Sequence, residues 1–231
     1  MLLLLSSTIM VKPIGIVFLC LAIFSACSFA PATLQSKQSS DLEGRRIRRI
    51  AILQPALFAP APVANVPFSS PPVTRTSEKD ASEALARFVH ASMATLPNWQ
   101  IVAESEVREA VVNAPPSSED IRLKRVGEMV YADAVMMGRV QRYRERIGDE
   151  WGAKSPASVA FVLDLVDVRR GDIVWTARFD ETQKSLSESI FSLGSIGERG
   201  VRWLSADQLT HEGVKKAIGQ LHDILSRRPS P

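Results

Sequence analysis

The sequence has almost no cysteine: Cys20 and Cys27 are the only two in 231 residues. A chain with so few cysteines cannot be a disulfide scaffold, and it lacks the paired cysteines of structural zinc sites. An excess of one charge is missing too, because 28 basic residues face 25 acidic ones. A net charge of +3 is too small to indicate a nucleic-acid-binding surface by itself, so we expect no nucleic acid partner.

Residue patterns typical of catalysis or metal binding are also lacking. Of the three histidines, His211 and His222 lie eleven positions apart, about 16 Å along a helix, so they cannot bind one metal ion together. Ser195 lies in a near match to the Gly-x-Ser-x-Gly nucleophile elbow, but Leu193 replaces the first glycine and no strand precedes it. We therefore expect no enzymatic activity and no catalytic, cofactor-binding or metal-binding residues.

The amino-terminal segment contains the longest apolar run. Lys12 is the only charged residue before it, and Ile14–Phe24 follows. Eleven helical residues reach about 16 Å, whereas the hydrocarbon core of a bilayer is about 30 Å thick. A short apolar run that follows a positive charge and ends in small residues predicts a secretory signal peptide. Since Met10 directly precedes this pattern, translation starts at either Met1 or Met10.

The run ends in Phe24-Ser25-Ala26-Cys27, which resembles the lipobox of bacterial lipoprotein signal peptides. The resemblance implies that residues 1–26 are removed and that Cys27 becomes a diacylated amino terminus. Two acyl chains are enough for stable anchoring in a membrane. Phe24 departs from the pattern, which usually has leucine there. Two alternatives stay open: an ordinary signal peptide cut near Ala30, and an uncleaved anchor lengthened by Met1–Met10.

The residue after the cysteine bears on the location of the anchor. Ser28, rather than aspartate, resembles the sorting pattern of outer-membrane lipoproteins. The predicted location is therefore the periplasmic face of the outer membrane, with the inner membrane as the alternative. Residues 27–47 are predicted to hold the lipid and a flexible tether, because Ser28–Gly44 is polar and rich in small residues.

Residues 48–226 are predicted to form one periplasmic α/β (α+β) domain, and 227–231 a tail. We expect a single mixed β-sheet of about five strands, with a β-hairpin and packed helices. The expected strands are Ile50–Leu53, Trp99–Ala103, Asp133–Arg146, Val159–Val168 and Ile173–Glu181. The expected helices run from Ser77 to Pro97, Ser105 to Val112, Ser118 to Tyr131 and Ser205 to Arg227. Pro55–Pro72 and Ser187–Leu204 lack periodicity and are predicted to be irregular.

The last two strands give the clearest local pattern. The connector Arg169–Gly171 suits a three-residue hairpin loop with glycine in the left-handed position. That loop sets a register in which Phe161 opposes Phe179, Leu163 opposes Ala177 and Leu165 opposes Trp175. The alternate positions form a second face that is at least partly wet. The acidic residues of the hairpin could suggest paired acids for glycan hydrolysis, but cross-strand pairing on a solvated face explains them more simply: Asp164, Asp167, Asp180 and Glu181.

Two basic clusters are the candidate binding surfaces. The first, Arg45–Arg49, is either a contact for anionic groups or a solvated strand flank. The second lies at the end of the strand Asp133–Arg146 and is either a partner-binding surface or a charged strand end that discourages aggregation. Its members are Arg139, Arg142, Tyr143, Arg144 and Arg146.

The order of elements after a lipobox resembles a group of bacterial envelope lipoproteins. The group includes the curli secretion channel lipoprotein, the lipoprotein activators of penicillin-binding proteins and the amino-terminal domain of the Tol translocation protein. The resemblance is carried by Ala132–Val140, which ends in a Gly-x-Val step, and by Ser158–Glu181, which contains Asp-Val-Arg-Arg-Gly-Asp-Ile-Val-Trp. The loop Gln141–Pro156 is too short and too charged for the membrane-crossing hairpins of a channel.

The resemblance implies an adaptor or assembly role without a catalytic set. We therefore expect a lipid-anchored, non-enzymatic protein that binds another envelope protein from the periplasmic side. A self-assembling subunit of a secretion or transport complex is the alternative.

Overall fold

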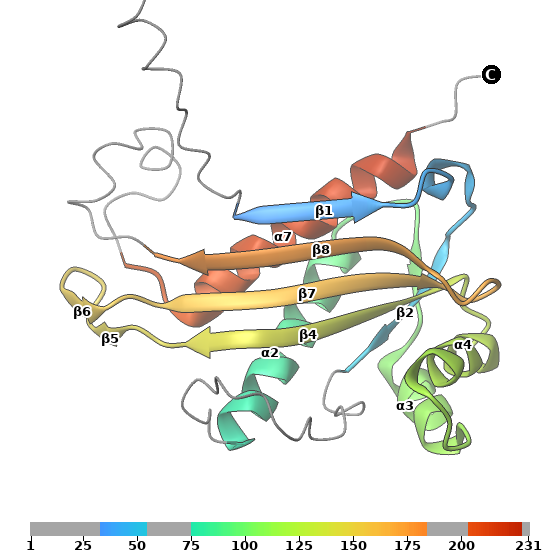
Figure 1. Cartoon of the computed structure of the whole chain (residues 1–231), viewed down its shortest axis with the longest axis horizontal. Helices are drawn as coiled ribbons and strands as arrows, with labels where there is room; N and C mark the ends of the chain where they lie inside the picture. The colour runs from blue at the N-terminus through green and yellow to red at the C-terminus, as the bar shows by residue number, and fades with distance from the viewer. Residues whose placement is uncertain (1–32, 55–74, 184–202, 228–231) are drawn as a thin grey trace, which may run out of the picture. The chain divides into compact units, whose positions relative to one another are not determined.

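The computed structural model describes residues 33–54, 75–183 and 203–227, all of which belong to the unit Thr33–Pro231. Its centre is a six-stranded mixed sheet in the order β1-β8-β7-β4-β2-β3 (Figure 1). The strands are β1 (Leu34–Gln38), β2 (Arg49–Leu53), β3 (Gln100–Ile101), β4 (Ala134–Arg144), β7 (Ser158–Asp167) and β8 (Ile173–Thr182). Strand β2 runs parallel to β3 and β4, and the other neighbours are antiparallel. A separate two-stranded sheet joins β5 (Ile147–Gly148) and β6 (Ala153–Ser155).

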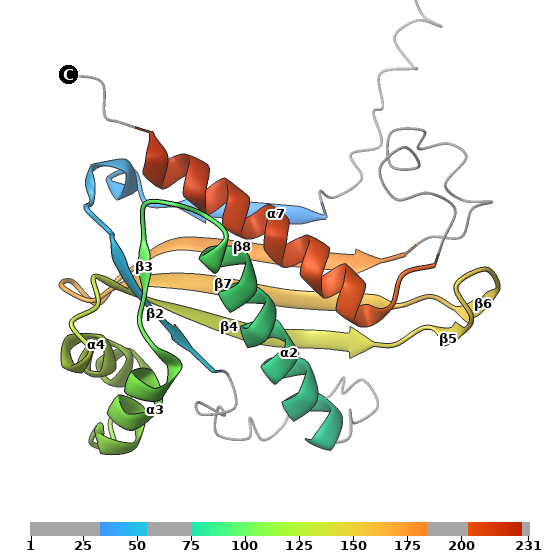
Figure 2. The ribbon, with the colours of Figure 1, turned by 180° about the vertical axis from the view of Figure 1, so that it is seen from behind.

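One face of the sheet packs against two long helices, α2 (Arg75–Ala94) and α7 (Ala206–Ser226) (Figure 2). Inward-facing residues of β7 and β8 form the centre of this core, with the rings of Phe161 and Phe179 stacked 5.0 Å apart. Gly213 lets α7 approach closely, because an added Cβ would lie 2.9 Å from the ring of Phe179. A larger residue at position 213 would therefore push the helix off the sheet.

The opposite face is covered only over part of its width. Helices α3 (Glu104–Asn113) and α4 (Glu119–Met129) pack there against β2, β4 and the end of β7. Gly127 of α4 makes this approach close, since an added Cβ would lie 2.3 Å from a methyl group of Val168.

The predicted fold class is confirmed, and the predicted hairpin register holds as far as Leu165 and Trp175, beyond which a bulge places Val166 opposite Ile173. The pairs Phe161–Phe179, Leu163–Ala177 and Leu165–Trp175 are those that the loop length predicts. Gly171 has the expected positive φ of 76°. A capping box begins α7, in which the Gln208 backbone N–H donates to the Ser205 hydroxyl.

One structural expectation is wrong. Leu34–Gln38, predicted to be flexible tether, is the edge strand β1, and the one-turn 3-10 helix Leu42–Gly44 follows with Leu42 fully buried. The sheet therefore includes residues that precede Arg48, and it has one strand more than expected. On α4, Val126 is buried whereas Ile121 and Met129 are exposed, because the face around Gly127 lies closest to the sheet.

Several predictions lie outside the described residues. They concern the leader with Cys27, the segment Pro55–Pro72 and most of Ser187–Leu204. Among the helices of the described ranges, none combines the length and apolarity that a membrane crossing requires.

Candidate functional site

The candidate site is the part of the sheet that α3 and α4 leave uncovered on their side. Over β1, β8, the first half of β7 and the last half of β4, no helix from the described residues lies on this face (Figure 1). Side chains here come from alternate positions paired across the strands. We call this surface the open face; it comprises Gln35, Lys37, Arg139, Arg142, Arg144, Ser158, Ala160, Val162, Asp164, Thr176, Arg178, Asp180 and Thr182.

A β-bulge decides which residues of β4 reach the open face. Val140 pairs with Phe161 and Arg142 with Ala160, so the extra residue Gln141 shifts the alternation by one position. Arg139, Arg142 and Arg144 therefore share one face, although their spacing does not follow strict alternation. This part of the predicted partner surface is brought together.

Asp164 lies near the middle of the open face and is 2% exposed. Its carboxylate accepts a hydrogen bond of 2.5 Å from the Arg139 guanidinium and one of 2.8 Å from the Thr176 hydroxyl. A buried carboxylate is tolerated when a cation and a donor satisfy it in this way. These contacts explain Asp164 as a structural group that orients Arg139 on the surface.

Arg142 is held by a second group of contacts. Its Nε donates to the Ser158 hydroxyl at 2.6 Å, and its guanidinium forms an ion pair with Asp180. The Ser158 and Thr182 hydroxyls are hydrogen-bonded at 2.6 Å. Arg142 thus has a fixed orientation, which suits a side chain that contacts a partner without a large loss of conformational entropy.

Other cations on the open face are not engaged in this way. Arg144 and Arg178 are exposed, and neither makes an ion pair with another described residue. Counting Lys37, five basic side chains share the face with two carboxylates, those of Asp164 and Asp180, so its formal charge is 5 − 2 = +3. The face is therefore complementary to an acidic surface.

The remaining two residues of the predicted partner surface lie elsewhere. Tyr143 points to the helix side, and its hydroxyl donates to Asp207 in the first turn of α7. Burial, together with that contact, raises the pKa of Tyr143 above its ordinary value. Arg146 follows β4 and donates to the carbonyl of Trp203. Both residues tie the end of β4 to the start of α7, so the five predicted residues do not form one surface.

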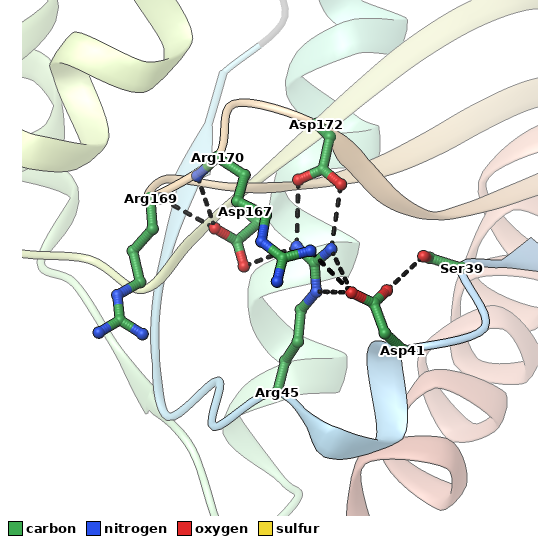
Figure 3. A network of polar contacts seen from close by, with 7 residues as sticks. All are labelled: Ser39, Asp41, Arg45, Asp167, Arg169, Arg170 and Asp172. Carbon is green, nitrogen blue, oxygen red and sulfur yellow. Dashed lines mark hydrogen bonds and ion pairs between the residues drawn. The ribbon is translucent and has the colours of Figure 1, made fainter.

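The basic cluster Arg45–Arg49 is also divided. Arg45, whose side chain is 10% exposed, donates to Asp167 at 2.8 Å, Asp41 at 2.9 Å and Asp172 at 3.0 Å (Figure 3). Its guanidinium joins the segment before β2 to the loop between β7 and β8. Arg49 pairs with Glu106, whereas Arg46 and Arg48 remain exposed.

The ion pairs of Arg45 affect its acidic partners. Hydrogen bonds from the Ser39 hydroxyl and from Arg45 lower the pKa of Asp41 to about 2. A hydrogen bond from Arg45 is also the main cause that lowers the pKa of Asp172. No sequence pattern predicts this network, because Arg45 lies more than 120 positions before Asp167 and Asp172.

Two of the three histidines pack against aromatic rings. His211 lies 5.4 Å from the ring of Phe88, and His222 lies 5.4 Å from the ring of Trp99. Burial lowers the pKa of His90. Within the described ranges, no three His, Cys, Asp or Glu side chains come together as a metal-binding group.

Comparisons with known proteins find similarity to solved structures. No protein-family model matches the chain, and no curated protein matches it in sequence. The PelC dodecamer from Paraburkholderia phytofirmans is 15% identical, with 84% of this chain and 97% of that chain covered and a TM-score of 0.44. The C-terminal domain of LpoB from Salmonella enterica is 12% identical, with coverages of 61% and 87% and a TM-score of 0.36. Lipoprotein GNA1162 from Neisseria meningitidis is 16% identical, with coverages of 66% and 98% and a TM-score of 0.38. The solved structures to which the chain is similar thus include a bacterial lipoprotein.

Proposed function

We propose that this protein is a lipid-anchored, non-enzymatic adaptor or assembly factor of the bacterial envelope. It binds an acidic surface of another envelope protein through the open face, from the periplasmic side. The observation that carries the proposal is the basic face of the sheet on which no helix of the described residues lies, with Arg144 and Arg178 exposed.

Two properties of the open face support binding. The first is its charge, because complementary charges accelerate encounter and discriminate against wrong partners. The second is its composition, since arginine is enriched at protein interfaces and Arg139 and Arg142 are already oriented by Asp164, Ser158 and Asp180.

The anchor is the second part of the proposal and rests on Cys27 and the apolar run before it. Two acyl chains would hold the protein at the periplasmic face of the outer membrane, or of the inner membrane as the alternative. Mass spectrometry of the mature amino terminus tests this directly. A diacylated Cys27 supports the anchor, whereas a free amino terminus near Ala30 or an intact leader overturns it.

The adaptor role is tested by photo-cross-linking in intact cells. A photoreactive residue replaces Gln35, which is exposed on the open face opposite Arg178. We expect it to capture a different envelope protein. The double variant Arg144→Glu/Arg178→Glu should reduce the capture about tenfold, which corresponds to ~1.4 kcal/mol.

The matched control reverses two charges elsewhere. Lys215 and Lys216 are exposed on α7, on the other side of the sheet, so Lys215→Glu/Lys216→Glu should leave the capture unchanged. Capture of only the same chain would favour the self-assembling subunit and overturn the adaptor role. No capture, or equal loss in both double variants, would overturn binding through the open face.

A further inference from the structure

The hairpin formed by β5 and β6 extends the strands β4 and β7 beyond the sheet (Figure 1). Its turn is built by specific contacts: the Asp149 carboxylate accepts hydrogen bonds from the backbone N–H groups of Trp151 at 2.9 Å and Gly152 at 2.6 Å. Gly148 has a φ of 108°, and an added Cβ there would lie 2.7 Å from the carbonyl oxygen of Gly152. The tip of the hairpin therefore has a defined conformation.

This defined turn presents apolar side chains to solvent. Trp151 is 72% exposed and Ile147 is 62% exposed. By contrast, Trp175 is 1% exposed, and Trp99 and Trp203 are partly buried. Tryptophan is the residue type that concentrates at the interface between water and a lipid bilayer, since its ring is apolar and its indole N–H is polar.

The chain from the proposed anchor enters the fold at the same end. The Thr33 carbonyl accepts a hydrogen bond from the backbone N–H of Asp180, which pairs with Ala160, which in turn pairs with Arg142. Arg142 lies just before the hairpin, so β1 begins at the end of the sheet from which the hairpin projects. Figures 1 and 2 show this arrangement from opposite sides.

The lengths of the two segments also match. Six residue steps join Cys27 to Thr33, and an extended chain of that length spans about 20 Å. Residues 145–157 form the hairpin, and half of that number, about six residues, spans at most about 20 Å when fully extended. A lipid on Cys27 and the hairpin tip can therefore touch the same membrane surface.

We infer that the hairpin is a second membrane contact, in which Trp151 and Ile147 enter the bilayer interface beside the lipid anchor. The inference rests on the proposed anchoring through Cys27. The anchor keeps the protein at the membrane, and the hairpin fixes the orientation of the domain, with the end that carries the hairpin toward the lipid. The open face, which runs along the strands away from that end, then stands out from the membrane and is accessible to a partner.

The charge of the hairpin region specifies the kind of membrane surface. Within residues 145–157, two basic residues face three acidic ones, so the formal charge is 2 − 3 = −1: Arg146 and Lys154 against Glu145, Asp149 and Glu150. We therefore expect the contact to form on zwitterionic lipid and to gain little from anionic lipid.

Quenching of tryptophan fluorescence by lipid tests the inference. The full-length mature protein is reconstituted into phosphatidylcholine vesicles with brominated acyl chains, which quench tryptophans that reach the bilayer. We expect quenching in the wild type and in Trp99→Phe, because Trp99 packs against His222 of α7 and donates to the Met93 carbonyl. Quenching should be at least halved in Trp151→Ser. Equal quenching in Trp151→Ser and wild type would overturn the inference.

The state of Cys27 separates this inference from the proposed anchor. If mass spectrometry shows two acyl chains and Trp151 stays unquenched, the hairpin contact is wrong while the anchor stands. If Cys27 carries no lipid, the anchor is wrong, and cosedimentation of the unacylated protein with the same vesicles decides the hairpin. Binding that Trp151→Ser abolishes would support the contact, and absence of binding would overturn it.

Discussion

The two ends of the central sheet use their side chains in opposite ways. At the end that holds the loop between β7 and β8, Arg45 gathers Asp41, Asp167 and Asp172, so charges are satisfied within the fold. At the other end, the hairpin of β5 and β6 exposes Trp151 and Ile147, so these side chains are not part of a hydrophobic core. One end therefore holds a buried charge network, and the other holds a turn that exposes two large apolar side chains.

The hairpin end is nevertheless firmly supported at its base. Tyr143 donates to Asp207, the Glu145 carboxylate accepts from the backbone N–H of Ala206 at 3.0 Å, and Arg146 donates to the Trp203 carbonyl. These contacts fix the base of the hairpin to the start of α7. A rigid base is what a surface needs if it is to hold the whole domain in one orientation.

The largest expected effect comes from breaking the Arg45 network. Arg45→Met should lower the free energy of unfolding by about 2–3 kcal/mol, because it removes a charge-assisted partner from Asp167. Asp167 would keep only the backbone N–H groups of Arg169 and Arg170. Urea denaturation measures the change, and Arg46→Met, at an exposed position, is the control, with an expected change within about 0.5 kcal/mol. Equal values for both variants would contradict the network's role.

Acid should weaken the same end of the sheet. The pKa of Asp41, about 2, and the lowered pKa of Asp172 both lie below the ordinary value of 3.8. A carboxyl group whose pKa is lower in the folded state stabilises the fold above pH 4, and that contribution is lost as pH falls toward 2. The stability difference between wild type and Arg45→Met should therefore shrink between pH 4 and pH 2. Urea denaturation across this range measures it, and a constant difference would argue against these ion pairs.

A smaller effect is expected at the base of the hairpin. Tyr143→Phe removes one hydrogen bond to Asp207 and should cost about 1 kcal/mol in urea denaturation. Since burial and Asp207 raise the pKa of Tyr143, its phenol should ionise only at a pH above the ordinary pKa of 10 in an absorbance titration. If Tyr143→Phe lacks the titration step at high pH, that step belongs to Tyr143. If the variant keeps the step, the step belongs to another group and the expected rise of the Tyr143 pKa is contradicted.

The sequence predicts the elements whose cause is local. The register of β7 and β8 from Phe161 to Leu165 is the one that the loop Arg169–Gly171 with its left-handed glycine predicts, although a bulge shifts the pairing next to the loop. The start of α7 follows from Ser205 and Gln208, which satisfy backbone groups within one turn. Both patterns need only neighbours in sequence.

Elements whose cause is distant could not be predicted. Strand β1, Leu-Gln-Ser-Lys-Gln, has no apolar alternation, since only one side of this edge strand pairs and most of its side chains are exposed. The ion pairs of Arg45 depend on loops that only the finished fold brings together.

The candidate site was predicted in part for the same reason. The basic character of β4 is readable, but the bulge at Gln141 decides that Arg139, Arg142 and Arg144 share a face while Tyr143 points to α7. An extra residue in one strand depends on its pairing with the other, so alternation within β4 alone gives no sign of it.

The smallest expected effect on stability separates the two ends most sharply. Trp151→Ser should change the free energy of unfolding by no more than about 0.5 kcal/mol, because the ring is mostly exposed and the turn is held by Asp149. Trp175→Phe, at a buried tryptophan on the helix side of β8, serves as the contrast and should cost about 1–3 kcal/mol. Urea denaturation in the absence of lipid measures both. If Trp151→Ser were as destabilising as Trp175→Phe, the ring would contribute to folding and its exposure would need no membrane. If Trp151→Ser leaves the free energy of unfolding unchanged, the exposed Trp151 ring does not stabilise the domain, and its role lies in a contact outside the domain.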